Sequence, residues 1–212
     1  MLWIIITICA SYLLGSIPTA YIFGRLLKGI DIRDFGSGNV GATNALRVLG
    51  KPVGITVLII DILKGVLAVA LLGNLLSAKV SFLPPEILRV MSGLCAIAGH
   101  NWTIFLNFKG GKGVATTFGV LAGLAFNIPG LKLILILTIA TWLTVFIIAR
   151  IISVASVISA IAMPVYMLVF KQSGILLFLS IILCLFIILR HKPNIKRVLR
   201  GKEPRLKFGK PN

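Results

Sequence analysis

Two short glycine-rich segments contain the residues of this chain best suited to binding an anion. The first covers residues 36–44 (GSGNVGATN) and the second covers residues 109–113 (KGGKG). Glycines let successive backbone N–H groups point at one anion, and serine, threonine, asparagine and lysine side chains add further donors. We call these segments the first loop and the second loop, and we expect both to bind phosphate groups.

The first loop leads into a short helical pattern over residues 45–50, with Arg47 one turn in. The start of a helix presents backbone N–H groups without acceptors and a partial positive charge, both of which favour a phosphate. Arg47 is expected to add a bidentate contact. An ordinary turn between helices would need fewer polar residues, so the pattern favours a phosphate site. Its expected members are Ser37, Gly38, Asn39, Gly41, Ala42, Thr43, Asn44 and Arg47.

The second loop resembles a nucleotide-binding P-loop only superficially. A P-loop has a glycine five residues before Gly111, where this chain has Leu106, and a serine or threonine after the lysine, where it has Gly113. Nucleotide hydrolysis is therefore not expected. We expect a metal-free phosphate clamp formed by Gly110, Gly111 and Lys112, supported by Lys109.

Three further ionisable residues have two interpretations each. Asp61 and Lys64 are three residues apart in an apolar stretch and so share one helix face. Ionisable residues at membrane depth often mark a functional site, but an opposite pair can also be purely structural. His100 could be a general base or a helix-packing histidine. Both readings stay open for each residue.

The composition is that of a polytopic membrane protein. The chain has 212 residues, of which 58% are hydrophobic, and a mean hydropathy of +1.05. Its net charge is +17, with 22 basic and 5 acidic residues. The basic residues lie between apolar stretches rather than on a soluble domain, so anionic lipid or an anionic substrate is expected and nucleic acid is not. So few carboxylates argue against a metal site, and no cofactor is expected.

The apolar stretches predict an all-α membrane protein with about seven transmembrane helices. They lie near residues 2–23, 53–73, 87–106, 114–127, 131–149, 152–170 and 174–190. The fourth stretch is short, so five spans are the alternative if it is re-entrant and pairs with a neighbour. Residues 1–212 are expected to form a single transmembrane domain.

The basic residues between the stretches predict the orientation. With seven spans, 17 lysines and arginines fall on one side and four on the other. The richer side should be cytoplasmic, which places the N-terminus outside and a basic tail, at about residues 191–212, inside. Both loops then lie at the cytoplasmic face. Beyond Arg200 the tail is expected to be only a surface segment near anionic headgroups.

Taken together, the motifs resemble the bacterial membrane acyl-phosphate:glycerol-3-phosphate acyltransferases. The matching residues are the first loop, Asp61-x-x-Lys64-Gly65, Gly99-His100, the segment 108–116 with the second loop, and Arg190-His191 with Asn194. The resemblance runs from Tyr12 to Arg200 with the motifs in order. It implies transfer of an acyl group from acyl phosphate to the 1-position of glycerol 3-phosphate, which gives lysophosphatidic acid and phosphate. This is the first acylation of phospholipid biosynthesis.

The resemblance also implies the location, the partner and the site residues. It implies a bacterial cytoplasmic (inner) membrane protein, a soluble partner enzyme that produces acyl phosphate, and no use of acyl-CoA or acyl carrier protein. The implied active-site residues are Ser37, Arg47, Lys112, Ser156, His191 and Asn194. We expect the first loop and Arg47 to hold the acyl-phosphate end, and Lys112, Ser156, His191 and Asn194 to hold glycerol 3-phosphate.

The sequence shows no dedicated general base. The His-x-x-x-x-Asp motif of other glycerol-phosphate acyltransferases is absent, because Phe105 follows His100 at that spacing and Lys196 follows His191. We therefore expect a phosphate oxygen of a substrate to accept the proton. The alternative function is a membrane transporter for phosphorylated anions, which would need polar residues through to the outer face. The expected outer loops contain no glycine-rich cluster, which argues against this alternative.

Overall fold

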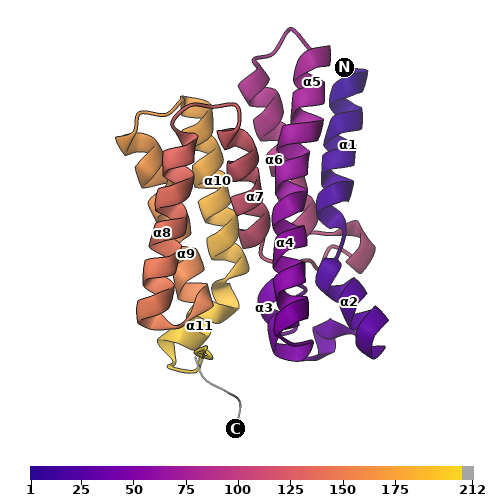
Figure 1. Cartoon of the computed structure of the whole chain (residues 1–212), viewed down its shortest axis with the longest axis vertical. Coiled ribbons are helices and arrows are strands. Elements are labelled where there is room, and N and C mark those ends of the chain that lie inside the picture. Colours follow the sequence, from indigo (N-terminus) through magenta and orange to yellow (C-terminus); the bar gives the residue numbers. More distant parts are fainter. Residues whose placement is uncertain (207–212) are drawn as a thin grey trace. The chain divides into compact units, whose positions relative to one another are not determined.

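The computed structural model describes residues 1–206 as helices joined by short loops (Figure 1). The chain divides into two compact units, Met1–Lys132 and Leu133–Asn212. The all-helical prediction is confirmed. The single-domain prediction stays a prediction, and each unit is described by itself below.

The first unit is built around two close helix pairs. Helix α1 packs on α6, and α4 packs on α7. A side chain at Gly15 would meet the backbone of Ala96, and side chains at Gly65 or Gly119 would meet the backbone of the opposite helix. Small residues at such crossings let backbones approach closely, which is the usual source of helix association in lipid. The elements are α1 (Leu2–Ser16), α2 (Thr19–Lys28), η1 (Ile32–Asp34), α3 (Ala42–Val48), α4 (Lys51–Leu67), η2 (Ala68–Gly73), α5 (Asn74–Lys79), α6 (Pro85–Asn101), η3 (Ile104–Leu106) and α7 (Val114–Ala125).

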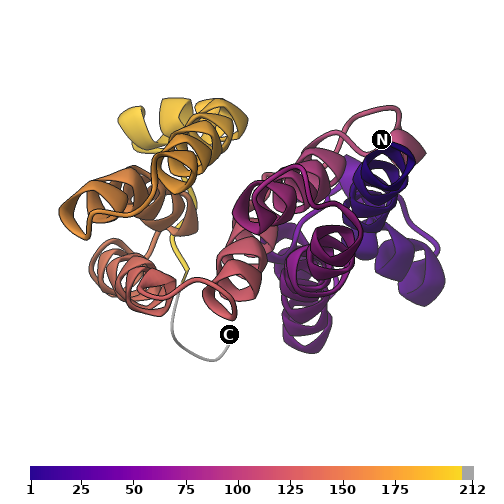
Figure 2. The same cartoon turned by 90° about the horizontal axis from the view of Figure 1, so that it is seen from above.

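The second unit has three long helices and a short one. They are α8 (Leu131–Ala149), α9 (Ile152–Val169), α10 (Gly174–Arg190) and α11 (Lys192–Leu199). Helix α9 packs on α10, and a 2.6 Å hydrogen bond between the hydroxyls of Thr141 and Tyr166 joins α8 to α9. The view along the helices shows α8, α9 and α10 as neighbours within this unit (Figure 2). The start of α9 and the beginning of α11 are the parts that bear predicted site residues.

The sequence predicts one continuous helix over residues 2–23, but the structure has two helices there, α1 and α2. The helix breaks between Ser16 and Thr19, with a 41° bend, because Pro18 has no backbone N–H to continue the hydrogen-bond ladder. Carbonyls exposed by a break in an apolar environment need new donors. Thr103 Oγ1 donates to the Ser16 carbonyl at 2.5 Å, and Lys64 Nζ donates to the Ile17 carbonyl at 2.6 Å. The break is thus built into the fold.

Each of the seven predicted stretches contains a helix in the structure, but not all of these helices are long enough to span a membrane by themselves. Three helical segments are long and apolar enough to cross a membrane: Lys51–Lys79, Leu131–Ala149 and Ile152–Val169. The number rises to five if the bent pairs α1 with α2 and α10 with α11 each count as one span. Helix α7 is apolar but shorter. Large apolar side chains such as Ile136, Ile147 and Leu168 are exposed, as expected of surfaces that face lipid.

Candidate active site

The first loop is held in shape by one buried side chain. Asn44, fully buried near the start of α3, accepts a 2.8 Å hydrogen bond from the Ser37 backbone N–H. Its amide group donates at 3.1 Å to the carbonyls of Ile32 and Phe35. The phosphate-binding role predicted for Asn44 stays a prediction, but the structure shows that this side chain fastens the loop onto itself.

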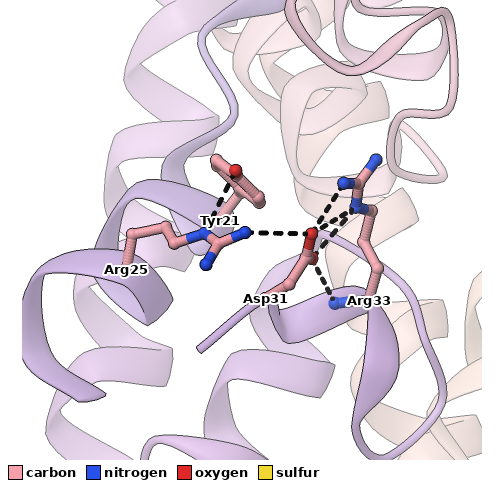
Figure 3. A network of polar contacts seen from close by, with 4 residues as sticks. All are labelled: Tyr21, Arg25, Asp31 and Arg33. Carbon is pink, nitrogen blue, oxygen red and sulfur yellow. Dashed lines mark hydrogen bonds and ion pairs between the residues drawn. The ribbon is translucent and has the colours of Figure 1, made fainter. Parts of the chain in front are cut away.

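The segment that leads into the first loop is fixed by a charged network (Figure 3). Asp31 accepts hydrogen bonds from the Arg33 side chain, the shortest at 2.6 Å, and lies 3.6 Å from the Arg25 guanidinium. Arg25 in turn donates to the Tyr21 hydroxyl at 3.1 Å. The hydrogen bonds from Arg33 lower the pKa of Asp31 to about 2 despite its burial. Asp31 therefore remains ionised at neutral pH and keeps this segment in place.

Several of the remaining predicted members of the first loop are exposed or half-buried, whereas Gly41 is buried and the Gly38 N–H donates to the Phe35 carbonyl at 3.0 Å. Helix α3 begins at Ala42, earlier than the pattern over residues 45–50 predicted, so Ala42 and Thr43 lie in its first turn. Helices leave the N–H groups of the first turn without acceptors inside the helix. The side chains of Ser37 and Arg47 are exposed. The loop thus combines a fixed backbone with accessible donors.

The second loop folds back onto the end of α6. Gly110 donates its N–H to the Asn101 carbonyl at 3.2 Å, and Gly111 donates to the His100 carbonyl at 2.9 Å. A Cβ at Gly111 would collide with the His100 imidazole, so only glycine fits there. Within the loop Lys112 is half-buried and Lys109 is exposed, and α7 begins directly after it at Val114. The loop's backbone is therefore positioned by His100 and Asn101 before any ligand arrives.

Asp61, Lys64 and His100 form a buried cluster behind the two loops. Lys64 Nζ lies 2.7 Å from Asp61 Oδ1, and the two side chains are 3% and 2% exposed. The Thr19 hydroxyl donates to Asp61 Oδ1 at 3.2 Å, and His100 Nδ1 lies 3.8 Å from the same oxygen. A narrow pocket among these side chains is also lined by Val40 of the first loop. Burial agrees both with a functional site and with a structural ion pair, so the contacts of Asp61 and Lys64 have to distinguish the two interpretations.

The second unit holds the other predicted site residues. His191 is buried at the end of α10, with Nδ1 2.8 Å from the Ile187 carbonyl oxygen. Ser156, in the second turn of α9, donates to the Ile152 carbonyl at 2.9 Å and accepts from Trp142 Nε1 at 3.2 Å. Asn194 is buried in α11 and donates to Glu203 Oε1 at 2.6 Å.

The expectation of a plain surface segment beyond Arg200 is wrong for Glu203. This side chain is 8% exposed and accepts hydrogen bonds from Ser153, Asn194 and Arg197, at 2.8, 2.6 and 2.7 Å. Burial opposes its ionisation, but these three donors lower its pKa overall. Glu203 therefore connects the start of α9, through Ser153, to α11, through Asn194. The feature of the sequence that could have indicated this role is that Glu203 is the one acidic residue in a basic tail.

Replacing Glu203 should loosen this arrangement. Glu203→Ala leaves three donors without their acceptor, and we expect a loss of about 1–3 kcal/mol in the free energy of unfolding. Glu203→Gln, which keeps one carbonyl acceptor, should lose less. The stabilisation is present above the ordinary glutamate pKa and is lost as the pH falls through the lowered value. Thermal unfolding of the three proteins in one detergent tests this, and equal unfolding temperatures would contradict it.

The described residues contain no group of three or more histidine, cysteine, aspartate and glutamate side chains arranged to hold a metal ion. Ser37, Arg47 and Lys112 belong to the first unit, and Ser156, His191 and Asn194 belong to the second. The structure places Gly111, the residue before Lys112, against His100, and it joins Asn194 to the start of α9 through Glu203.

Comparison with known proteins identifies relatives along the whole chain. The sequence model of a family described as glycerol-3-phosphate acyltransferase matches residues 5–201. A protein named glycerol-3-phosphate acyltransferase from Chlorobium phaeobacteroides (strain BS1) is 43% identical in an alignment of 237 positions, gaps included, that covers 98% of each chain. One named glycerol-3-phosphate acyltransferase 2, from Moorella thermoacetica, is 45% identical over 205 residues, which cover 97% of this chain and 98% of the relative.

Two solved structures resemble this one. Both are crystal structures of PlsY, an integral membrane glycerol 3-phosphate acyltransferase. The glycerol 3-phosphate form has a TM-score of 0.84 and 34% identity, covering 96% of both chains. The lysophosphatidic acid form has a TM-score of 0.81 and 33% identity, covering 96% of this chain and 95% of the other.

Proposed function

The chain belongs to the glycerol-3-phosphate acyltransferase family, and from this premise we propose that it transfers a fatty acyl group from acyl phosphate to the 1-hydroxyl of glycerol 3-phosphate. The hydroxyl oxygen attacks the acyl carbonyl carbon, the bond from that carbon to the phosphate oxygen breaks, and lysophosphatidic acid and phosphate form. Acyl phosphate is a mixed anhydride with a good leaving group. The protein therefore needs to supply mainly orientation and charge stabilisation.

The observation that supports this proposal best is the build of the two loops. Both substrates carry a phosphate group, and the first unit has two glycine-rich loops whose backbones are fixed by the protein itself. Asn44 holds the first loop, and the backbone carbonyls of His100 and Asn101 hold the second. Fixed loops hold side-chain donors such as Ser37 and Lys112 in place, and donors that need little rearrangement when charge develops are the most effective kind in catalysis.

We assign the first loop and Arg47 to the phosphate of the acyl donor. We assign Gly110, Gly111 and Lys112, together with Ser156, His191 and Asn194, to glycerol 3-phosphate. Ser37 and Arg47 are exposed and Thr43 is half-buried, so these side chains offer accessible donors, as an amphiphilic substrate at a membrane face requires, whereas Gly41 and Asn44 are buried. Lys112 adds a positive charge, as a small phosphorylated alcohol requires, on a loop that is held in place because the Gly110 and Gly111 N–H groups donate to the Asn101 and His100 carbonyls.

We further propose that a phosphate oxygen of a substrate, rather than a side chain, accepts the proton of the hydroxyl. Single replacements Ser37→Ala, His100→Ala and His191→Ala should then each lower kcat by less than about 10²-fold, the lower end of what a general base contributes. Rates at saturating concentrations of both substrates measure this. One variant that loses all turnover but still binds both substrates would identify a side-chain base and contradict the proposal.

The membrane setting follows from the charge distribution. We propose seven spans, with the N-terminus outside and both loops at the cytoplasmic face of the bacterial inner membrane. The acyl tail of the donor would lie between helices, and a soluble enzyme that makes acyl phosphate would supply it from the cytoplasm. Single cysteines at Lys79 and at Lys202 should be labelled by an impermeant reagent from opposite sides of the membrane.

A comparison of acyl donors tests the function itself. The purified protein should form lysophosphatidic acid from glycerol 3-phosphate with acyl phosphate, but not with acyl-CoA or acyl carrier protein. A transporter of phosphorylated anions would instead move glycerol 3-phosphate into vesicles without forming a product. Uptake without acylation would overturn the proposal.

A further inference from the structure

Asp61 and Lys64 lie where the broken first helix, α4 and the second loop meet. Lys64 Nζ donates to the Ile17 carbonyl at 2.6 Å and pairs with Asp61 at 2.7 Å. Asp61 also accepts from the Thr19 hydroxyl at 3.2 Å. Ile17 and Thr19 flank Pro18, so the pair holds both sides of the break between α1 and α2.

The same pair lies directly beside His100. His100 Nδ1 is 3.8 Å from Asp61 Oδ1, and the His100 side chain is 7% exposed. The opposite side of the ring is covered by Gly111, where an added Cβ would collide with Nε2. The His100 ring thus fills the space between the carboxylate and the second loop.

The end of α6 is tied to the same break by a second set of contacts. The Thr103 hydroxyl donates to the Ser16 carbonyl at 2.5 Å, and the Tyr12 hydroxyl donates to the Trp102 carbonyl at 2.6 Å. The second loop follows, and its Gly110 and Gly111 N–H groups donate to the carbonyls of Asn101 and His100. A shift of the break would therefore be passed on to the second loop.

We propose that the buried Asp61–Lys64 pair is a positioning element for the glycerol 3-phosphate site: it fixes the His100 ring, on which Gly111 packs, and so sets the geometry of residues 109–113. This inference rests on the proposed function, which assigns the second loop to glycerol 3-phosphate. The pair acts through His100, and neither of its members touches substrate.

A neutral double variant separates positioning from stability. Removing one member of a buried pair leaves an unpaired charge and destabilises strongly, whereas replacing both members is often close to neutral. Asp61→Asn with Lys64→Met leaves no unpaired charge but removes the donor to the Ile17 carbonyl, so it should still fold, with a Tm lowered by no more than about 10 °C. Its KM for glycerol 3-phosphate should rise about tenfold, while kcat and the KM for acyl phosphate change by less than about threefold.

A second pair of variants covers the case in which the double variant fails to fold. Thr19→Val removes only the donor to Asp61 and nearly keeps the side-chain shape, while Thr19→Ser restores the hydroxyl. The valine variant should raise the KM for glycerol 3-phosphate by about threefold, and the serine variant should return it to the original value. Arg89→Met with Asn74→Leu is the matched control, because it removes a 2.6 Å contact of a cation in the same unit that touches neither loop.

Binding of glycerol 3-phosphate, measured as Kd by calorimetry beside KM, keeps the inference separate from the proposed function. An unaltered protein that binds glycerol 3-phosphate but forms no lysophosphatidic acid would overturn the function, and the Kd values of the variants would still test the positioning. Folded variants whose Kd and KM equal those of the unaltered protein would overturn the positioning role. So would equal losses in kcat, Tm and affinity for both substrates, because these indicate only a structural role.

Discussion

Replacing Lys112 with methionine lowers kcat/KM for glycerol 3-phosphate by about 10²–10³-fold in our account. The methionine keeps the apolar stem of the side chain but removes the charge, and the loss of one well-placed donor to a developing anion has this magnitude. Lys112 is half-buried between Gly111 and Gly113, just before α7, so the residues adjacent to it in the sequence carry no charge that could replace its ammonium group. Steady-state rates with varied glycerol 3-phosphate at saturating acyl phosphate measure the effect.

Lys202→Met is the matched control for this variant. Lys202 is also a lysine of the expected cytoplasmic side, but it is exposed in the tail after α11. This control should change kcat/KM by less than about twofold, because a single exposed charge contributes little. If both variants lose activity equally, net charge at the membrane rather than a bound phosphate explains the effect. Lys112→Met with full activity would remove Lys112 from the site.

Gly111→Ala should strongly reduce acylation without unfolding the protein. The added methyl group would collide with the His100 ring, whose side chain is 7% exposed and lies against the buried pair on its other side. The loop must move instead, and a displacement of about 1 Å in a substrate-positioning group can cost 10²-fold in rate. We expect kcat/KM for glycerol 3-phosphate to fall by at least about 10²-fold, with a Tm near that of the unaltered protein.

Gly174→Ala provides the matched control, since no atom lies within 4 Å of a Cβ at Gly174 and its backbone has an ordinary φ. This variant should keep both full activity and full stability. Activity and Tm are measured on the same preparations. An active Gly111→Ala enzyme would mean that the contact with His100 does not fix the loop.

The helices could be predicted from the sequence because length and hydropathy determine them locally. The stretch near 114–127 becomes α7 at Val114–Ala125, and the stretch near 131–149 becomes α8 within the same bounds. Boundaries that depend on other parts of the chain were less accurate. The stretch 53–73 continues to Lys79, since a π-helical segment, Ala68–Gly73, carries α4 into α5 without a break.

The break at Pro18 shows what local reasoning lacks. Proline predicts a lost hydrogen bond, but whether the helix bends or stops depends on the donors that replace it. Those donors are Thr103, from the segment after α6, and Lys64, from α4. The sequence contains all of these residues, but their meeting is a property of the fold.

The candidate site divides in the same way. Glycine, serine and lysine in short loops predict anion donors because that chemistry is local, and this stays a prediction, whereas the hydrogen bonds of the Gly110 and Gly111 N–H groups to α6 carbonyls depend on the fold. The role of Asn44 could not be separated from that of its neighbours, since its bonds to Ser37, Ile32 and Phe35 depend on how the loop folds. The role of Glu203 was missed because it depends on hydrogen bonds from Ser153 of α9 and Asn194 of α11, and the spacing of residues in the tail does not predict these partners.

The most direct test of the central claim is the product balance of the purified protein given acyl phosphate and glycerol 3-phosphate in a metal-free buffer. Our account predicts that lysophosphatidic acid and inorganic phosphate form in a 1:1 ratio, at a rate that depends on both substrates. Phosphate release without lysophosphatidic acid, or lysophosphatidic acid formed only when an acyl thioester is supplied, would contradict it.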